Sequence, residues 1–181
     1  MKSMPHTILS LGILLQGVAF LLPAQTTPKE TLRRFCELDT NGGQFKPEKW
    51  ASISKFFVEP GPPSIKSVSI VRDYVITDDE PVLGDKTDMY VEYARVGHIE
   101  YPSLRILDWS PIMVRWLSVL VKVHPDGADK RTEWRISGKV IQPYLTLDTA
   151  RRLAPEWRDQ AKDPRVRENA EKLIAVLNHP R

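Results

Sequence analysis

Three arginines stand within strand-like stretches that are otherwise largely apolar, and their side chains could recognise an anion there. Arg72 lies in IVRDYVI, Arg95 in DMYVEYARVGHI and Arg115 in IMVRWLSVLVKV. A guanidinium group binds a carboxylate through two parallel hydrogen bonds, and aromatic walls exclude water from such a contact. One interpretation is therefore a pocket for a small organic anion. The residues predicted to bind this ligand are Tyr74, Tyr93, Arg95, Arg115 and Trp134.

Whether these arginines form a pocket or belong to an ordinary protein surface depends on the strand face on which each one lies. Side chains alternate between two faces along a strand, so Arg95 shares a face with Tyr93, and Arg115 with Leu117. We expect both sets to point inward. In the alternative interpretation, each stem covers apolar surface while the charged group reaches solvent or pairs with a carboxylate. The candidate carboxylates are Asp39, Asp73 and Glu92.

The sequence gives no support to metal or cofactor chemistry. The stretch ELDTNGG resembles the start of a calcium loop, but Gln44 stands where a turn glycine is needed and Trp50 where a bidentate glutamate belongs. The four histidines are scattered along the chain. Glycine-rich phosphate loops and nucleophile motifs are absent from the sequence. We therefore predict no metal and no cofactor.

Charge and cysteine content narrow the class of protein further. The 26 basic residues are interleaved with 23 acidic ones, and a net charge of +3 without a basic stripe argues against nucleic acid as a partner. Cys36 is the only cysteine, so an intramolecular disulfide is impossible. It stands at helical spacing beside Leu32 and Phe35, which predicts a buried and unreactive thiol.

The first 24 residues read as a targeting segment. Lys2 supplies a basic start, TILSLGILLQGVAFLL an apolar run, and Ala24 a small residue before a polar stretch. We expect a signal peptide over 1–24, cleavage after Ala24, and a mature protein exported to the periplasm or the extracellular space. The alternative is an uncleaved leader, which would tether the chain to a membrane.

Helices are predicted at both ends of the remaining chain. PKETLRRFCELDTNGGQF begins at Thr27 and Pro28 and ends at its glycines, and KPEKWASISKFF forms a second, short helix. Near the other end, LDTARRLAPEWRDQ can begin at Asp148, and DPRVRENAEKLIAVLN has Asp163 as its N-cap. Its predicted buried face consists of Val166, Ala170, Leu173, Ile174 and Leu177.

Four strand-like runs lie between these helices, at about 67–77, 87–101, 111–124 and 131–144. They follow one another without intervening helices, which favours antiparallel pairing. In TEWRISGKVIQPYL, the Trp134 side is apolar through Ile136, Gly138 and Val140, so it must be covered. The inward set predicted for the third run is Met113, Arg115, Leu117, Val119, Val121 and Val123.

These elements predict an α+β fold with N-terminal helices packed across a curved antiparallel sheet of about four strands, and additional C-terminal helices. We expect a domain over 25–145 and a helical extension over 146–181. The element order, with WRISGKVIQPYLTLDTA at the last strand, resembles the nuclear transport factor 2-like superfamily over roughly 28–145. That superfamily includes SnoaL-like polyketide cyclases, ketosteroid isomerase and scytalone dehydratase. The resemblance implies a cone with an internal pocket, and a homodimer through the open sheet face.

The resemblance also implies an acidic general base near a tyrosine in enzymes of this shape. Asp39 is the catalytic candidate, since it ends the first helix and could meet Tyr74 or Tyr93. Apolar walls would have to raise its pKa. Our first hypothesis is an exported small-ligand-binding or protein-interaction domain without catalysis. The alternative is a cofactor-independent lyase or isomerase that uses Asp39.

Overall fold

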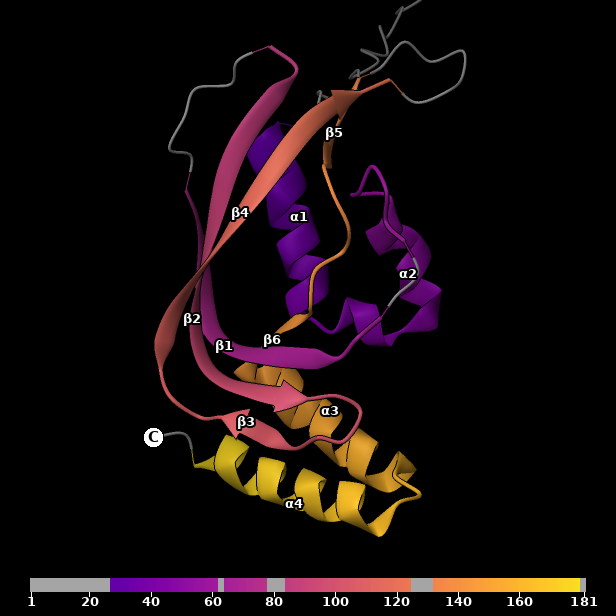
Figure 1. Cartoon of the computed structure of the whole chain (residues 1–181), viewed down its shortest axis with the longest axis vertical. Helices are drawn as coiled ribbons and strands as arrows, with labels where there is room; N and C mark the ends of the chain where they lie inside the picture. The colour runs from indigo at the N-terminus through magenta and orange to yellow at the C-terminus, as the bar shows by residue number, and fades with distance from the viewer. Residues whose placement is uncertain (1–26, 62–63, 78–83, 125–131, 180–181) are drawn as a thin grey trace, which may run out of the picture.

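A computed structural model describes residues 27–61, 64–77, 84–124 and 132–179 (Figure 1). The predicted signal peptide and its cleavage site lie outside these residues. Within the described ranges, no helix is long and apolar enough to cross a membrane.

The two predicted N-terminal helices are confirmed. Helix α1 (Pro28–Thr40) begins where the Thr27 hydroxyl accepts a hydrogen bond from the Glu30 backbone N–H at 3.1 Å. It ends before Gly42, whose φ of 79° suits a residue without a β-carbon. A short 3-10 helix, η1 (Gly43–Phe45), leads into α2 (Pro47–Ser54). Phe57 lies beyond α2 and bridges to Ile136 instead.

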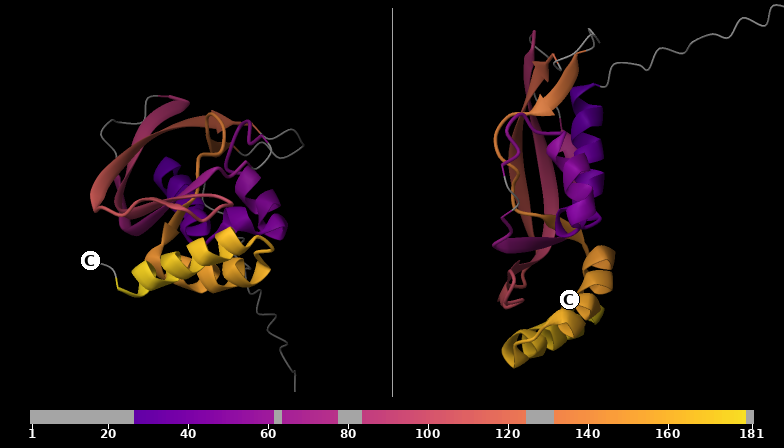
Figure 2. Two further views of the ribbon diagram at one scale, coloured as in Figure 1. Left: turned by 60° about the horizontal axis from the view of Figure 1, so that its bottom comes forward. Right: turned by 90° about the vertical axis from the view of Figure 1, so that its right-hand side faces the viewer.

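The sheet is curled and mixed, and the α+β class is confirmed. Its long strands are β1 (Ser67–Thr77), β2 (Lys86–Glu100) and β4 (Ile112–Val123). Its short strands are β3 (Ile106–Asp108), β5 (Glu133–Ile136) and β6 (Tyr144–Thr146). The order is β5-β4-β2-β1-β6, with β3 paired to β2. All pairs are antiparallel except β1 with β6. The strands curl around α1 (Figure 2).

The fourth predicted strand is much shorter than expected. Instead of extending over 131–144, β5 covers only Glu133–Ile136, and the chain re-enters the sheet at β6. Gly138 adopts a φ of 103°, which turns the chain out of the extended conformation, and Pro143 has no N–H to donate to a neighbouring strand. The predicted inward side of β5 is correct, because Ile136 is buried and Trp134 packs against the core.

The predicted inward face of β4 is wrong. Val114, Trp116 and Leu120 pack into the core, whereas 64% of Met113 and 45% of Leu117 is exposed. Arg115 therefore lies on the solvent side. The run IMVRWLSVLVKV is apolar on both faces, so its alternation carries little information about which face is buried.

Two hydrophobic cores lie along the molecule. The first fills the space between α1 and the sheet and is centred on Phe35, Phe57, Val91, Tyr93 and Tyr144. The second lies between one end of the sheet and the two C-terminal helices, α3 (Leu147–Gln160) and α4 (Pro164–Asn178) (Figure 1). The Asp163 carboxylate caps α4 through the Arg165 N–H at 2.8 Å, as predicted. Ala170, Leu173 and Leu177 form the buried stripe of that helix.

Candidate functional site

The interior of the curled sheet is packed with aromatic side chains. The Phe35 ring lies 5.0 Å from Phe57 and 5.8 Å from Trp116, between centroids. Tyr93 and Tyr144 stack at 3.8 Å with an angle of 8° between their planes. These large side chains fill the space between α1 and the sheet, so the interior is a packed core.

Asp39, the catalytic candidate, is fully buried at the end of α1. Its Oδ1 accepts a hydrogen bond from the Gln44 side-chain amide at 2.7 Å, and its Oδ2 accepts one from the Tyr144 backbone N–H at 3.0 Å. Burial raises its pKa to about 7, although both hydrogen bonds act in the opposite direction. The carboxyl group thus joins α1, η1 and β6.

The only cysteine lies beside this group. Cys36 is buried, as the sequence predicts, and its Sγ lies 3.5 Å from the Tyr93 hydroxyl oxygen. Burial raises the pKa of the Cys36 thiol to about 12, and it also raises the pKa of Tyr93. Both groups are therefore neutral near pH 7 and form part of the core.

The residues predicted to bind an organic anion lie in different places. Tyr74 is 5.9 Å from Tyr93 between ring centroids, inside the sheet. Trp134 lies further along the same face, at β5. Arg115 lies on the opposite face, where its Nε is 3.5 Å from Glu92. That ion pair is one of those expected in the alternative interpretation.

Arg95 is largely buried near β3, and 15% of its side chain is exposed. Its Nη2 donates to the Asp108 carboxylate at 2.9 Å. Arg95 also lines a shallow hollow of about 220 Å³ together with Arg72, Pro111, Ile112 and Met113. The structure thus brings two of the three arginines together, but away from Tyr93 and Trp134.

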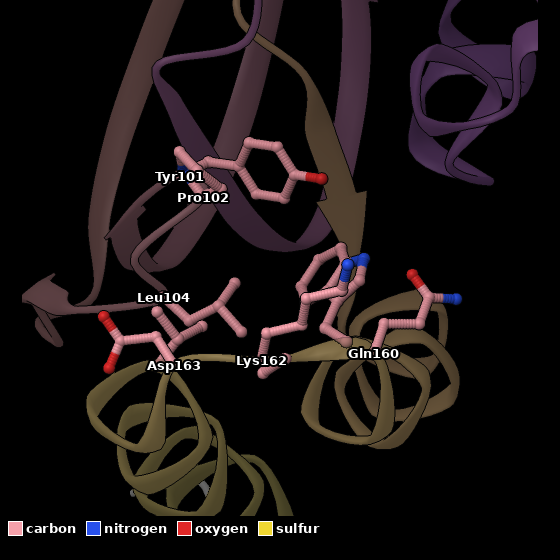
Figure 3. Close-up of a pocket in the computed structure, with 9 residues that line it drawn as sticks. Tyr101, Pro102, Leu104, Gln160, Lys162 and Asp163 are labelled. Carbon is pink, nitrogen blue, oxygen red and sulfur yellow. The ribbon is translucent and has the colours of Figure 1, made fainter.

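A second hollow, of about 290 Å³, lies between the β2–β3 turn and the junction of α3 with α4 (Figure 3). Tyr101 and Leu104 form its apolar side, and Gln160 and Lys162 face them. The Asp163 carboxylate at its rim is already engaged as the cap of α4. Among the described residues, no group of three histidine, cysteine or acidic side chains could hold a metal ion.

Two further hollows, of about 330 and 500 Å³, lie along α1 and α2. Lys46, Lys49 and Lys55 line them, and the sequence analysis does not single these lysines out. Lys46 and Lys49 stand three residues apart in KPEK, a spacing that makes two side chains neighbours on a helix, so this pair had a readable signal. Lys55 stands six residues further on, a spacing that does not place it on the same side of a helix.

The face of the sheet that points away from α1, here called the outer face, carries cross-strand pairs of β2 with β4, and three of these pairs carry the argument that follows. Register pairs Ala94 with Met113, Glu92 with Arg115, and Tyr90 with Leu117. Val75 extends the middle pair into a row because it stands opposite Glu92, and 56% of it is exposed. The Arg115 guanidinium also lies 3.7 Å from the centroid of the Tyr90 ring. The Glu92–Arg115 ion pair is thus flanked by apolar side chains, and Asp88 and Lys86 continue the outer face beyond Tyr90.

In comparisons with known proteins, no family model, no curated protein and no solved structure matches the chain.

Proposed function

We propose that this chain is a non-catalytic interaction domain that pairs with a second copy of itself through the outer face. The observation that carries the proposal is the exposure of Val75, Met113 and Leu117 on one sheet face, while the opposite face is filled by its own side chains. Neighbouring apolar side chains that remain exposed commonly mark interaction sites. The expected export of the mature chain is compatible with this role.

The charges at the centre of the outer face favour a second copy over an unrelated partner. Glu92 and Arg115 are neighbours of opposite sign, and about half of the Arg115 side chain is exposed. In a two-fold dimer each surface meets itself, so Arg115 of one copy can face Glu92 of the other. A pair of opposite charges surrounded by Tyr90, Met113 and Leu117 is complementary to itself under that symmetry.

The alternative, a cofactor-independent lyase or isomerase, has one observation in its favour. The pKa of Asp39 is raised to about 7, which suits a general base. However, Asp39 lines none of the four hollows described above, and each of its oxygens already accepts a hydrogen bond. We therefore favour the interaction domain.

Sedimentation of purified protein over a range of concentrations tests the pairing. We expect a reversible dimer, and Leu117→Lys should weaken it at least about tenfold, because burying an unpaired ammonium group is costly. Leu107→Lys is the matched control: Leu107 is exposed to 46%, almost as much as Leu117, but it lies on β3.

A parent protein that stays monomeric at about 0.1 mM would contradict the proposal, since an interface of only about −5 kcal/mol would associate there. So would equal weakening by both lysine variants. The charge pair gives a second test: Glu92→Arg should weaken pairing, and adding Arg115→Glu should restore it.

A further inference from the structure

The two hollows along α1 and α2 adjoin each other, because Arg34, Leu38 and Phe56 line both. We call this surface the helix groove. It extends from Trp134 on β5 to Arg152 on α3, on the side of the sheet opposite the outer face. Figure 2 shows α1 and α2 together on that side.

The floor of the helix groove is apolar and already packed. Leu38, Phe56 and Trp134 are all partly buried against the first core. The Phe56 ring lies 6.2 Å from Phe35, between centroids, so it is held from beneath. A ligand would thus meet an apolar surface that needs little reorganisation, which reduces the entropy cost of binding.

The rim of the helix groove is strongly basic. Its cations are Arg34, which pairs with Glu30 at 2.8 Å, and Lys46, Lys49, Lys55 and Arg152. The two acidic residues that line it, Glu37 and Glu133, are engaged by Arg33 and Arg135. In the part of the chain that the structure describes, the ammonium groups of Lys46, Lys49 and Lys55 form no ion pair. The rim therefore has positive charge to offer an anionic partner.

We propose that the helix groove binds an acidic peptide segment whose carboxylates meet the lysines while an apolar side chain covers the floor. The stretch of α1 that lines it, from Thr31 to Asn41, is about 15 Å long. Four or five extended residues span about that distance. A concave groove with an apolar floor fits a chain better than it fits the flat surface of a lipid bilayer.

Fluorescence anisotropy can test this with a labelled hexapeptide that alternates glutamate with leucine and phenylalanine. The double variant Lys46→Gln with Lys49→Gln should raise the Kd about threefold to tenfold, the effect of losing two solvent-exposed ion pairs. Added salt should also raise the Kd of the parent protein for the peptide. Lys172→Gln is the control and should leave the Kd unchanged, because Lys172 is an exposed lysine on α4, and no residue of α4 lines either hollow.

Two further probes separate charge from apolar contact. An all-glutamate hexapeptide should bind more weakly than the alternating one, and a hexapeptide with lysine in place of glutamate should not bind. Circular dichroism of the variants verifies that they are folded.

Three results would each overturn the proposal: equal binding to parent and double variant, no binding of the alternating peptide, or binding only to phosphatidylglycerol vesicles. Leu117→Lys should bind the peptide normally, so failure of self-association and failure of the groove remain distinguishable.

Discussion

At the scale of single residues, Asp39 shows how one buried carboxyl group can join distant parts of the fold. Its carboxyl group holds Gln44 and the backbone of Tyr144, a residue 105 positions further along the chain. A general base must reach its substrate, and Asp39 has no exposed surface. Burial causes the raised pKa of Asp39. Shifted pKa values are common at functional sites and also occur in structural networks.

The raised pKa of Asp39 predicts an unusual dependence of stability on pH. Its pKa is about 7 in the folded protein and near 3.8 in an ordinary environment, so the folded state holds more protons between those values. The free energy of unfolding should therefore fall as pH rises from about 4 to about 7, by about 4 kcal/mol at most. Denaturant melts at a series of pH values measure this.

Asp39→Asn is the control, because it keeps the shape of the side chain but cannot ionise. Glu30, Glu100, Glu168 and His98 have lowered pKa values, so the stability that they add increases with pH, for the glutamates around their ordinary value of 4.5 and for the histidine around 6.5. Parent and variant share these contributions, so the difference in stability between the two proteins isolates Asp39. A difference that does not change in the parent's disfavour between pH 4 and pH 7 would show that Asp39 is ionised when folded.

At the scale of elements, the sequence predicted helices more accurately than strand faces. Thr27 and Asp163 cap α1 and α4 through bonds to residues two or three positions away, so these signals are local and can be read directly. The faces of β4 depend on which side α1 covers, and that contact is distant in sequence. The signal peptide over 1–24 stays a prediction, because it lies outside the residues that the structure describes.

One close contact between elements gives a prediction that no sequence pattern suggested. A β-carbon added at Gly97 on β2 would lie 2.4 Å from the Trp109 ring, far inside normal contact distance. Gly97→Ala should therefore cost about 1 to 3 kcal/mol of stability, the usual penalty for overpacking. The loss should shrink when Trp109→Leu is added, which a double-mutant cycle of denaturant melts measures. Additive losses would mean that the cost of Gly97→Ala does not come from contact with the indole.

At the scale of the whole molecule, the candidate sites arise where distant segments meet, which explains why sequence reasoning found them only in part. Arg115 and Tyr90 were visible as residues, but their common exposed face requires the pairing of β4 with β2. The helix groove combines α1, α2, β5 and α3. The spacing of Lys46 and Lys49 was readable, whereas their approach to Lys55 and Arg152 was not.

The separation of the two proposed surfaces by the sheet predicts independent binding. Self-association should leave the helix groove open, so each chain should bind one alternating hexapeptide in the dimer and in the monomeric Leu117→Lys variant alike. Sedimentation velocity with labelled peptide gives both the mass of the complex and the peptide bound per chain. One peptide per dimer would show that the two surfaces obstruct each other.

The bond between Asp39 and the backbone of Tyr144 also has a consequence for the order of folding. The parallel pairing of β6 with β1 and the anchoring of α1 both require residues from late in the chain. Contacts between such distant residues slow the search for the native state, since a long loop must close first. During synthesis, α1 and the β1–β2 hairpin therefore emerge well before their last partner, and the first core closes only after Tyr144 has been added.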